Sequence, residues 1–258
     1  MSVVNEPQKE RYSFSKLNAF LTCKYGYKLT YIDHLKGIGN CFSSYGLEVH
    51  SIMERYAKGE LSLWDLVSTY EWEFDGAVQE PFPSTKYCED MRKLYYEQGL
   101  EFLKNFPGYS DKKILEVESA FDYEIEDWIF TGVIDLVYEE KETGKLVIQD
   151  YKSKSSFKNK KEQAEYARQL YLYSLYVKEK YGRYPDTLRF LMFRKNTPID
   201  IQFNEKDLSS AINWAKETVK EIRDCWDYSP SCEEFYSQNL CNHRHMCKEK
   251  VQPQKKSK

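Results

Sequence analysis

No run of apolar residues in this 258-residue sequence is long enough to cross a bilayer. The first ten residues, MSVVNEPQKE, lack the apolar core of a signal peptide, so we expect a cytoplasmic chain. Internal repeats and linkers rich in Gly or Ser are also absent. With 41% apolar residues to build a core, the sequence favours one large domain, alone or with a helical appendage.

Positive charge is not in excess, because 38 Lys and Arg residues stand against 41 Asp and Glu residues. This balance counts against a general nucleic-acid binder, since such proteins are usually basic. The stretch from Lys152 to Arg168 is nevertheless locally basic, and so is the tail, residues 251–258. Lys154 and Lys158 are therefore candidate contacts to nucleic acid, and an ordinary solvated surface is the alternative.

A phosphate-binding loop is missing as well. Gly144 and Lys145 look like the end of such a loop, but Leu146 stands where Ser or Thr is required. No Gly lies five residues upstream of Gly144. The pair therefore predicts a hairpin turn, and nothing here indicates an ATPase.

The pattern of apolar residues predicts five helices and five strands. The helices are expected at about 13–32, 44–57, 87–105, 162–181 and 207–226. The strands are expected at about 114–125, 128–138, 145–151, 188–194 and 199–203. Helices, three strands, a helix, two strands and a helix follow one another, an order that indicates an α/β sandwich built on a mixed sheet.

Two carboxylates and a lysine carry the main chemical signal. Asp135 lies inside the apolar strand GVIDLV, and Asp150 and Lys152 end the next strand on one face, two residues apart. A carboxylate in such a strand is costly unless it is paired or binds a cation. Two of them on neighbouring strands suit Mg²⁺ or Mn²⁺, which would activate a water against a phosphate. Lys152 would orient that water and the phosphate. A salt bridge at the strand ends is the alternative.

Further side chains on neighbouring elements agree with this site. His50 lies on the second helix, where it could complete the metal shell, contact phosphate, or serve only the core. Glu116 and Glu118 alternate on the strand before Asp135, and Glu118 ranks first as an additional ligand.

The helix after the second carboxylate strand carries a group of polar and aromatic side chains. Gln169 and Tyr173 share one of its faces, four residues apart, and Tyr166 and Tyr176 gather there too. This row of tyrosines could stack on bases or pack under another segment.

Seven cysteines in a reducing compartment favour a metal site over disulfides. Cys23 lies almost opposite the apolar stripe of its predicted helix, so burial in the core is not expected. Together with Cys232, Cys241 and Cys247, it could hold an iron–sulfur cluster that staples the C-terminal segment to the first helix. The alternatives are a zinc site that recruits His243 or His245, and a site that holds no metal.

In combination these motifs resemble the RecB-like branch of the PD-(D/E)XK nucleases, and most of all its small CRISPR-associated and phage-encoded iron–sulfur exonucleases. The similarity runs from Tyr12 to Cys247 in the family order. It rests on SFSKLNAFLTC at 13–23, His50, GVIDLV with Asp135, IQDYKSK with Asp150 and Lys152, and QLYLY with Gln169 and Tyr173. Ile134 stands where the superfamily has Pro, as it often does in this branch.

The resemblance implies a role for each of these residues. His50, Asp135 and Asp150 would bind the metal, Lys152 would be catalytic, and Gln169 and Tyr173 would contact DNA. Relatives with the iron–sulfur staple typically have a C-x2-C-x5-C motif near the C-terminus. Here Cys241 and Cys247 keep the second spacing, but Gln238 takes the first position, so Cys232 would have to reach in from upstream.

The implied fold is the restriction-endonuclease-like mixed sheet flanked by helices. We expect one nuclease domain over residues 1–258. It divides into a helical N-terminal part (12–110), a catalytic α/β core (111–206), a C-terminal helix with the cysteine segment (207–250) and the basic tail (251–258).

The sequence therefore predicts a Mg²⁺- or Mn²⁺-dependent DNA exonuclease that acts on single strands or ends. Its context would be recombination, repair, phage DNA processing or CRISPR adaptation. No helicase motif is present, so a helicase or another recombination or CRISPR protein would supply the DNA, unless the nuclease acts alone. The alternatives are an endonuclease or RNA-preferring nuclease of the same fold, and a non-catalytic module that binds DNA ends.

Overall fold

The computed structural model describes residues 9–83, 88–233 and 236–247, so the predicted basic tail lies outside the described residues. A six-stranded mixed sheet forms its centre. The strands are β1 (Arg11–Tyr12), β2 (Lys112–Ile125), β3 (Trp128–Glu140), β4 (Leu146–Lys152), β5 (Thr187–Met192) and β6 (Thr197–Gln202). Among the described residues, no helix is both long and apolar enough to cross a membrane.

The strands run in the order β1-β3-β4-β5-β6, with β2 paired to β3. The β2–β3, β3–β4 and β5–β6 pairs are antiparallel, whereas β4 and β5 are parallel. A parallel pair needs a crossover, and α6 (Lys160–Tyr181) supplies it. The prediction of a mixed sheet flanked by helices is confirmed, and it is the PD-(D/E)XK arrangement that the resemblance implied.

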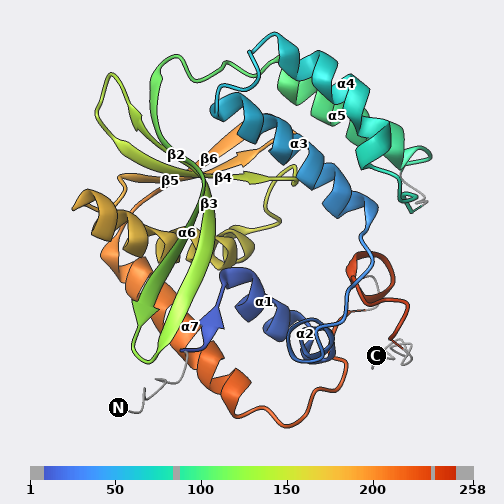
Figure 1. The fold of residues 1–258 in the computed structure, drawn as a ribbon, viewed down its shortest axis with the longest axis vertical. Helices are drawn as coiled ribbons and strands as arrows, with labels where there is room; N and C mark the ends of the chain where they lie inside the picture. Colours follow the sequence, from blue (N-terminus) through green and yellow to red (C-terminus); the bar gives the residue numbers. More distant parts are fainter. Residues whose placement is uncertain (1–8, 84–87, 234–235, 248–258) are drawn as a thin grey trace, which may run out of the picture.

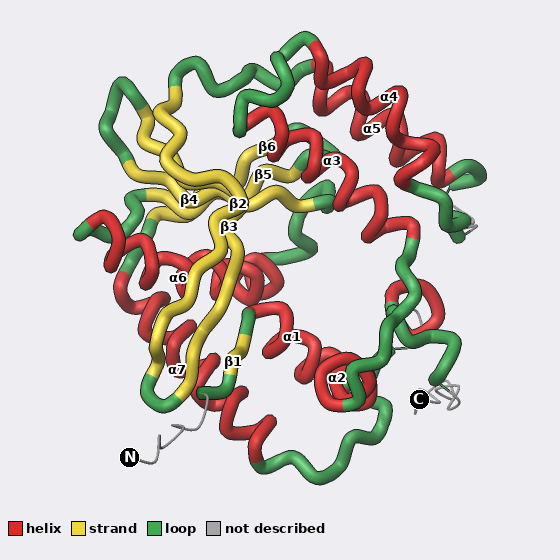
Figure 2. Tube along the Cα trace, in the orientation of Figure 1, coloured by secondary structure: helices red, strands yellow, loops and turns green. Residues whose placement is uncertain are grey.

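Helices cover both faces of the sheet (Figures 1 and 2). One face packs on α6, on α7 (Glu205–Arg223) and on α1 (Phe14–Thr22). The other face packs on α3 (Cys41–Ala57), α4 (Asp65–Ala77) and α5 (Met91–Lys104). Because β4 lies between two helical layers, nearly all of its residues are buried, including the polar Gln149 and Asp150.

The first predicted helix is wrong as a single element, since the chain breaks at Cys23. Cys23 adopts an extended conformation, with φ −160° and ψ 108°, and it ends α1. The short helix α2 (Lys24–Tyr27) and a π-helical turn, η1 (Lys28–Ile32), follow it. The helical periodicity used to place Cys23 on an exposed face therefore does not apply, and its thiol is buried.

Strand β1, helix α4 and the π-helical turn η2 (Tyr236–Leu240) were not predicted from the sequence. Strand β1 is only two residues long and pairs parallel with β3, so it has no periodicity of its own. Helix α4 does carry a signal, because its buried residues Leu66, Tyr70 and Phe74 recur every four positions.

A set of hydrogen bonds, which we call the clasp, joins residues 38–40 to residues 240–244. The backbone N–H of Ile38 donates to the carbonyl of Asn242 at 2.8 Å. The Arg244 guanidinium donates to the carbonyl of Gly39 at 2.8 Å and to that of Ile38 at 3.4 Å. The buried Asn40 donates through Nδ2 to the carbonyl of Leu240 at 3.2 Å. The C-terminal segment, which includes the π-helical turn η2 (Tyr236–Leu240), is thus tied to the start of α3.

Asn40 has a second task, because its Oδ1 accepts a hydrogen bond from the backbone N–H of Ser43 and so caps α3. We expect Asn40→Ala to lose both bonds and to lower the free energy of unfolding by about 2 kcal/mol. Asn40→Ser keeps an N-cap oxygen and should lose about half as much. Urea unfolding curves measure both effects.

Asn159→Ala is the matched control, since Asn159 caps α6 through the backbone N–H of Glu162 without any contact to the C-terminal segment. Asn159→Ala should lower the free energy of unfolding only by the amount that one N-cap hydrogen bond contributes. An Asn40→Ala variant no less stable than Asn159→Ala would contradict the double role of Asn40.

Candidate active site

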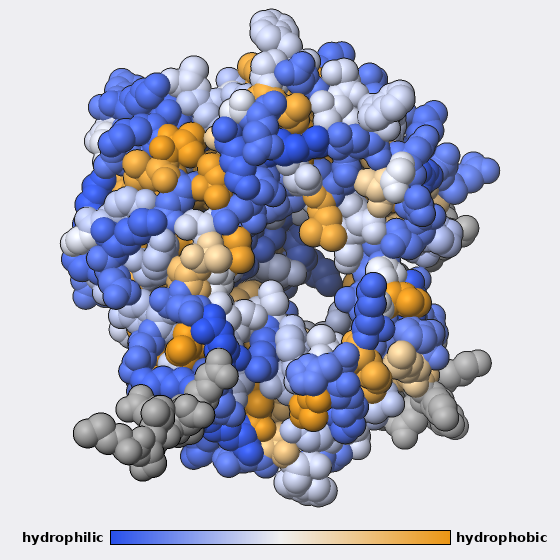
Figure 3. Space-filling view, viewed as in Figure 1, coloured by the Kyte–Doolittle hydropathy of each residue, from blue (hydrophilic) through white to orange (hydrophobic). Residues whose placement is uncertain are grey.

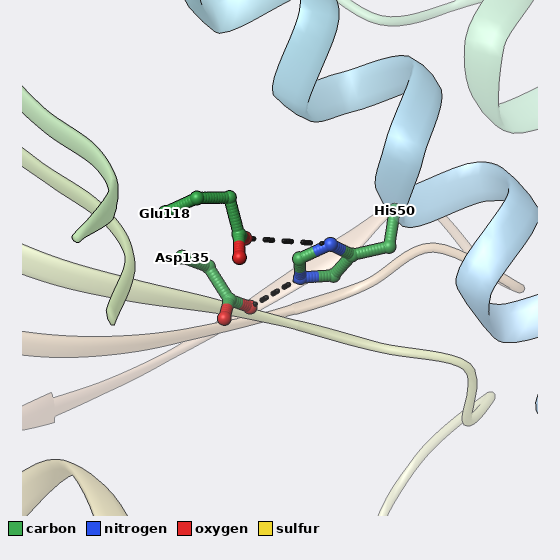
Figure 4. Close-up of side chains that lie close together, drawn as sticks. All are labelled: His50, Glu118 and Asp135. Carbon is green, nitrogen blue, oxygen red and sulfur yellow. Dashed lines mark ion pairs between the residues drawn. The ribbon is translucent and has the colours of Figure 1, made fainter. Parts of the chain in front are cut away.

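Three ligand-type side chains from three elements meet on one face of the sheet (Figure 4). His50 of α3 places its Nε2 2.9 Å from Oδ2 of Asp135 on β3. Its Nδ1 lies 3.5 Å from Oε1 of Glu118 on β2. Among the described residues, these three form the only group of three or more His, Cys, Asp or Glu side chains whose ligand atoms all lie within 4.8 Å of one another. We call them the metal-ligand group.

Strand register and backbone conformation bring the members of the metal-ligand group together. The register pairs Val117 with Leu136 and Ser119 with Ile134, so Glu118 falls opposite Asp135. Glu118 has a positive φ of 48°, an unusual conformation for a residue with a side chain. Asp135 is held by the backbone N–H of Tyr151, which donates to its Oδ2 at 2.8 Å.

The structure therefore separates the two glutamates that the sequence left open. Glu118 lies with His50 and Asp135 in the metal-ligand group. Glu116 is buried elsewhere, where it accepts hydrogen bonds from the hydroxyls of Tyr176 and Tyr181 and pairs with Lys180. These two hydroxyls and the Lys180 ammonium compensate the negative charge of the Glu116 carboxylate. Glu116 therefore has a structural role.

A second chain of polar groups starts at Asp150 and runs to α6. The ammonium of Lys152 donates to Oδ1 of Asp150 and to Oε1 of Gln169, each at 3.0 Å. The amide of Gln169 in turn donates to the hydroxyl of Tyr173 at 3.0 Å. These contacts fix the ammonium from two sides, so Lys152 points a positive charge at the buried carboxylate from a defined position.

Asp150 does not belong to the close group around His50, but it interacts with that group electrostatically. Burial raises the pKa of Asp150, and the negative charge of Asp135 raises it further, against the opposing charges of Lys152 and His50. Burial also raises the pKa of Glu118, to about 7, with help from Asp135. Burial alone would lower the pKa of His50, but its hydrogen bond to Asp135 and the nearby carboxylates raise it to about 9.

These properties fit a divalent cation. Oε1 of Glu118 and Oδ2 of Asp150 are buried oxygens with no hydrogen bond from the described residues, although the Lys152 ammonium lies 2.8 Å from the latter. Carboxylate oxygens with unused lone pairs are the ligands that Mg²⁺ or Mn²⁺ prefers, and a cation among them would offset the burial and the mutual repulsion that raise their pKa values. His50, Glu118, Asp135 and Asp150 are therefore the residues that could hold a metal here.

The remaining sequence-predicted contacts are placed as follows. Lys154 pairs with Glu162 at 2.7 Å and lies over the ring of Tyr166, whereas the Lys158 side chain is exposed and its backbone N–H bonds Glu162. Tyr173 is buried, and its ring packs against Phe121. Tyr173 is thus packed against another segment, which is one of the two alternatives that the sequence left open for the tyrosine row. Only the Tyr173 hydroxyl lies on the side of Gln169.

The C-terminal segment brings its cysteines to the break after α1. Cys23, Cys232 and Cys241 are buried, and Cys247 is half-buried. The thiols of Cys23 and Cys232 hydrogen-bond to each other. Against burial, this bond and backbone hydrogen bonds lower the pKa of Cys23, whereas burial and the charges of Cys23 and Cys241 raise the pKa of Cys232. Cys241 interacts with both Cys23 and Cys247 in the same way. Nearby, the ring of the buried His243 places Nε2 2.8 Å from Oγ1 of Thr30.

The match to a family model decides what this geometry belongs to. The model described as "PD-(D/E)XK nuclease superfamily" matches residues 11–248, which include every residue discussed above. The chain belongs to the PD-(D/E)XK nuclease superfamily. Membership places it among nucleases, which are hydrolases that use divalent metals, and confirms the family resemblance seen in the sequence.

A solved structure shares this fold. A structure from Eubacterium rectale, described as a "Putative exonuclease", is 14% identical and superposes with a TM-score of 0.53. The match covers 98% of this chain and 95% of that chain, so the fold is shared over nearly the whole length. A second structure, SSO0001, is 10% identical with a TM-score of 0.41, over 96% of this chain and 90% of that chain. No curated protein has a sequence that matches this PD-(D/E)XK chain.

Sequence reasoning missed Tyr151 as part of the site. Besides donating its N–H to Asp135, it packs its ring edge-on against His50, with the ring centres 5.3 Å apart. It thus contacts two candidate ligands from a third element. Its position between Asp150 and Lys152 was a signal, because alternation along the strand directs its side chain to the opposite face, toward α3.

Glu118→Gln tests the electrostatic description of the site. The folded-state pKa of Glu118 is raised from 4.5 to about 7, so ionisation of this group costs stability progressively between those pH values. In EDTA we expect the variant to melt at a higher temperature than the unsubstituted nuclease at pH 8 and at the same temperature at pH 4.

Glu139→Gln is the control for this measurement. Glu139 is a strand carboxylate on the surface, paired with Lys113 and Arg183, and these partners lower its pKa. Its replacement should not stabilise the chain at pH 8. Equal melting temperatures for Glu118→Gln and the unsubstituted chain at pH 8 would show that Glu118 carries no such penalty.

Proposed function

We propose that this nuclease is a Mg²⁺- or Mn²⁺-dependent exonuclease that hydrolyses the phosphodiester backbone of DNA, on single strands or at ends. The observation that carries the proposal is the position of Lys152. Its ammonium is fixed between Asp150 and Gln169 and lies 2.8 Å from Oδ2 of the buried Asp150 carboxylate.

Each of these residues has a defined task in that reaction. His50, Glu118, Asp135 and Asp150 would hold the cation, which supplies Lewis acidity toward the phosphate and its attacking water. Lys152 orients the water and stabilises the negative charge that develops on the phosphate. Gln169 keeps the Lys152 ammonium in place through its side-chain oxygen. Tyr151 restrains Asp135 and His50 from the protein side.

A preference for single strands or ends is supported by the shape of the molecule. Figure 3 shows a deep opening in the surface, in the region where Figure 1 draws α3 above and α1 and α2 below. The chain is continuous from α1 through α2, η1 and residues 33–40 to α3, so it encloses one side of this opening. A single strand that enters by its end meets no such barrier, whereas an internal stretch of duplex does.

Cleavage assays test this function directly. We expect the purified chain to degrade end-labelled single-stranded DNA with Mn²⁺ or Mg²⁺ and to be inactive in EDTA. Lys152→Ala should abolish cleavage with fold and DNA binding intact, because the lysine acts on the reacting phosphate. Asp135→Ala and Asp150→Ala should lose cleavage together with Mn²⁺ binding, measured by calorimetry.

Lys145→Ala, in the exposed turn between β3 and β4, is the matched control and should cleave normally. Near-normal cleavage by any of the three site variants contradicts the assignment. Cleavage of circular single strands would favour an endonuclease, faster cleavage of RNA would favour an RNA-preferring nuclease, and binding of DNA ends without cleavage would favour a non-catalytic module.

We also propose that Cys23, Cys232, Cys241 and Cys247 hold a [4Fe-4S] cluster that staples the C-terminal segment to the N-terminal helices, and that the chain works as one domain. The proposal is supported by the position of the four cysteines, which come from both ends of the described chain and gather at the break after α1. Partners that could supply DNA are a helicase or other recombination or CRISPR proteins.

The cluster predicts a colour and a pattern of stabilities. Protein purified without oxygen should be brown, with iron and sulfide in equal amounts, whereas colourless protein that contains zinc would favour the zinc alternative. Cys23→Ser and Cys247→Ser should each lower the melting temperature by similar amounts, and the double variant should be hardly worse, because the residues act as one unit.

Cys225→Ser serves as the control, since Cys225 lies outside the proposed set of four ligands and its thiol donates to the carbonyl of Asp227 at 3.2 Å. It should melt like the unsubstituted chain. Additive losses in the double variant, or a Cys23→Ser variant as stable as Cys225→Ser, would contradict a shared cluster.

A further inference from the structure

Two apolar side chains are exposed beside the metal-ligand group. Leu47 on α3 is 72% exposed, and Val133 on β3 is 44% exposed. Leu47 precedes His50 by three residues, so both share one helix face. Val133 precedes Asp135 by two residues, so both share one strand face. Since His50 and Asp135 are in contact, the two apolar residues flank the same group from two different elements.

Each of the two apolar residues lies close to a member of the metal-ligand group on its own element. Leu47 is one helical turn from His50, and two strand residues separate Val133 from Asp135 by about 6.6 Å. Helix α3 borders the region of the opening in Figure 3. A single exposed leucine on a surface needs no explanation. Two exposed aliphatic side chains, each next to a candidate metal ligand of a nuclease, instead indicate a surface that binds a ligand.

We propose that Leu47 and Val133 contact the faces of unpaired bases next to the cleaved phosphate, and that this contact makes the enzyme select single strands. The inference rests on the proposed function and adds the surface that recognises the substrate. Nucleotides combine a charged phosphate with an apolar base face. The charged groups around Lys152 suit the former, and the aliphatic pair suits the latter.

This assignment follows from which side chains are available. The Tyr173 ring, an expected base contact, is buried against Phe121 and cannot offer its face to a base in this arrangement. In a duplex the base faces are already stacked on one another, so an aliphatic contact is open only to unpaired bases. Leu47 and Val133 would therefore discriminate by contact with the bases and without reading their sequence.

The experiment compares two ligands that differ only in their bases. In a Lys152→Ala background, which blocks cleavage, fluorescence anisotropy measures the affinity for an oligothymidylate and for an abasic oligomer of equal length. We expect Leu47→Ser to weaken oligothymidylate binding by about tenfold, because a buried leucine contact is lost. Val133→Thr, which keeps the shape and strand preference of valine, should weaken it in the same direction. Affinity for the abasic oligomer should not change.

Leu94→Ser is the matched control, because Leu94 is a half-exposed leucine on α5 (36%) that packs away from the metal-ligand group. It should leave both affinities unchanged. In the cleavage-competent chain, Leu47→Ser should also lower the ratio of single-strand to duplex cleavage.

Three outcomes would overturn the inference alone: equal losses for both oligomers, no loss for either, or an effect of Leu94→Ser as large as that of Leu47→Ser. No loss for either oligomer, with lost capture of a protein partner, would indicate a protein-docking surface instead. A chain that cleaves no nucleic acid with Mn²⁺ would instead overturn the proposed function, and this inference with it.

Discussion

Repulsion between carboxylates is the constraint on which this site depends. Glu118 and Asp135 meet from β2 and β3, the charge of Asp135 also acts on Asp150 of β4, and burial weakens the screening between these carboxylates. Without a cation, the charge of His50 and the ammonium of Lys152 are the available compensation. Two carboxylate oxygens still lack hydrogen bonds from the described residues. The folded chain therefore holds an electrostatic conflict that a divalent cation relieves, and cation binding and folding favour each other.

The surrounding structure holds this conflict in place. The edge of β2 is bent at Glu118 by a positive φ, which directs its carboxylate toward Asp135. Helix α3 buries Val49, Ile52 and Met53 in the core on one face, so His50 on the next face is fixed relative to the sheet. The crossover helix α6 buries residues 170–175 and presents Gln169 to Lys152. Each ligand thus comes from an element whose position is set by apolar packing elsewhere.

Much of this could be predicted from the sequence, for identifiable reasons. Asp135, Asp150 and Lys152 stand out because charged residues in apolar strands are costly, and strand alternation fixes their faces. The contact of His50 with Glu118 and Asp135 required the tertiary placement of α3, which no local pattern encodes. Cys23 was misplaced because helical periodicity was extended through a break in the backbone. Tyr173 was ambiguous because a helix buried on both sides has no single apolar face, and its surroundings decide between stacking on bases and packing.

The clasp between residues 38–40 and 240–244 has a consequence for how the enzyme folds during its synthesis. The cap of α3 hydrogen-bonds to Leu240, and Gly37 approaches Asn242 so closely that a Cβ at Gly37 would lie 2.6 Å from the Asn242 Cβ. A ribosome delivers residues 240–244 about two hundred positions after Asn40, and so long a loop closes late. During synthesis, α3, which carries His50, therefore gains its hydrogen bonds to residues 240–244 only after β2, β3 and β4 have been synthesised. A nascent chain thus carries its carboxylates before His50 is held in place among them.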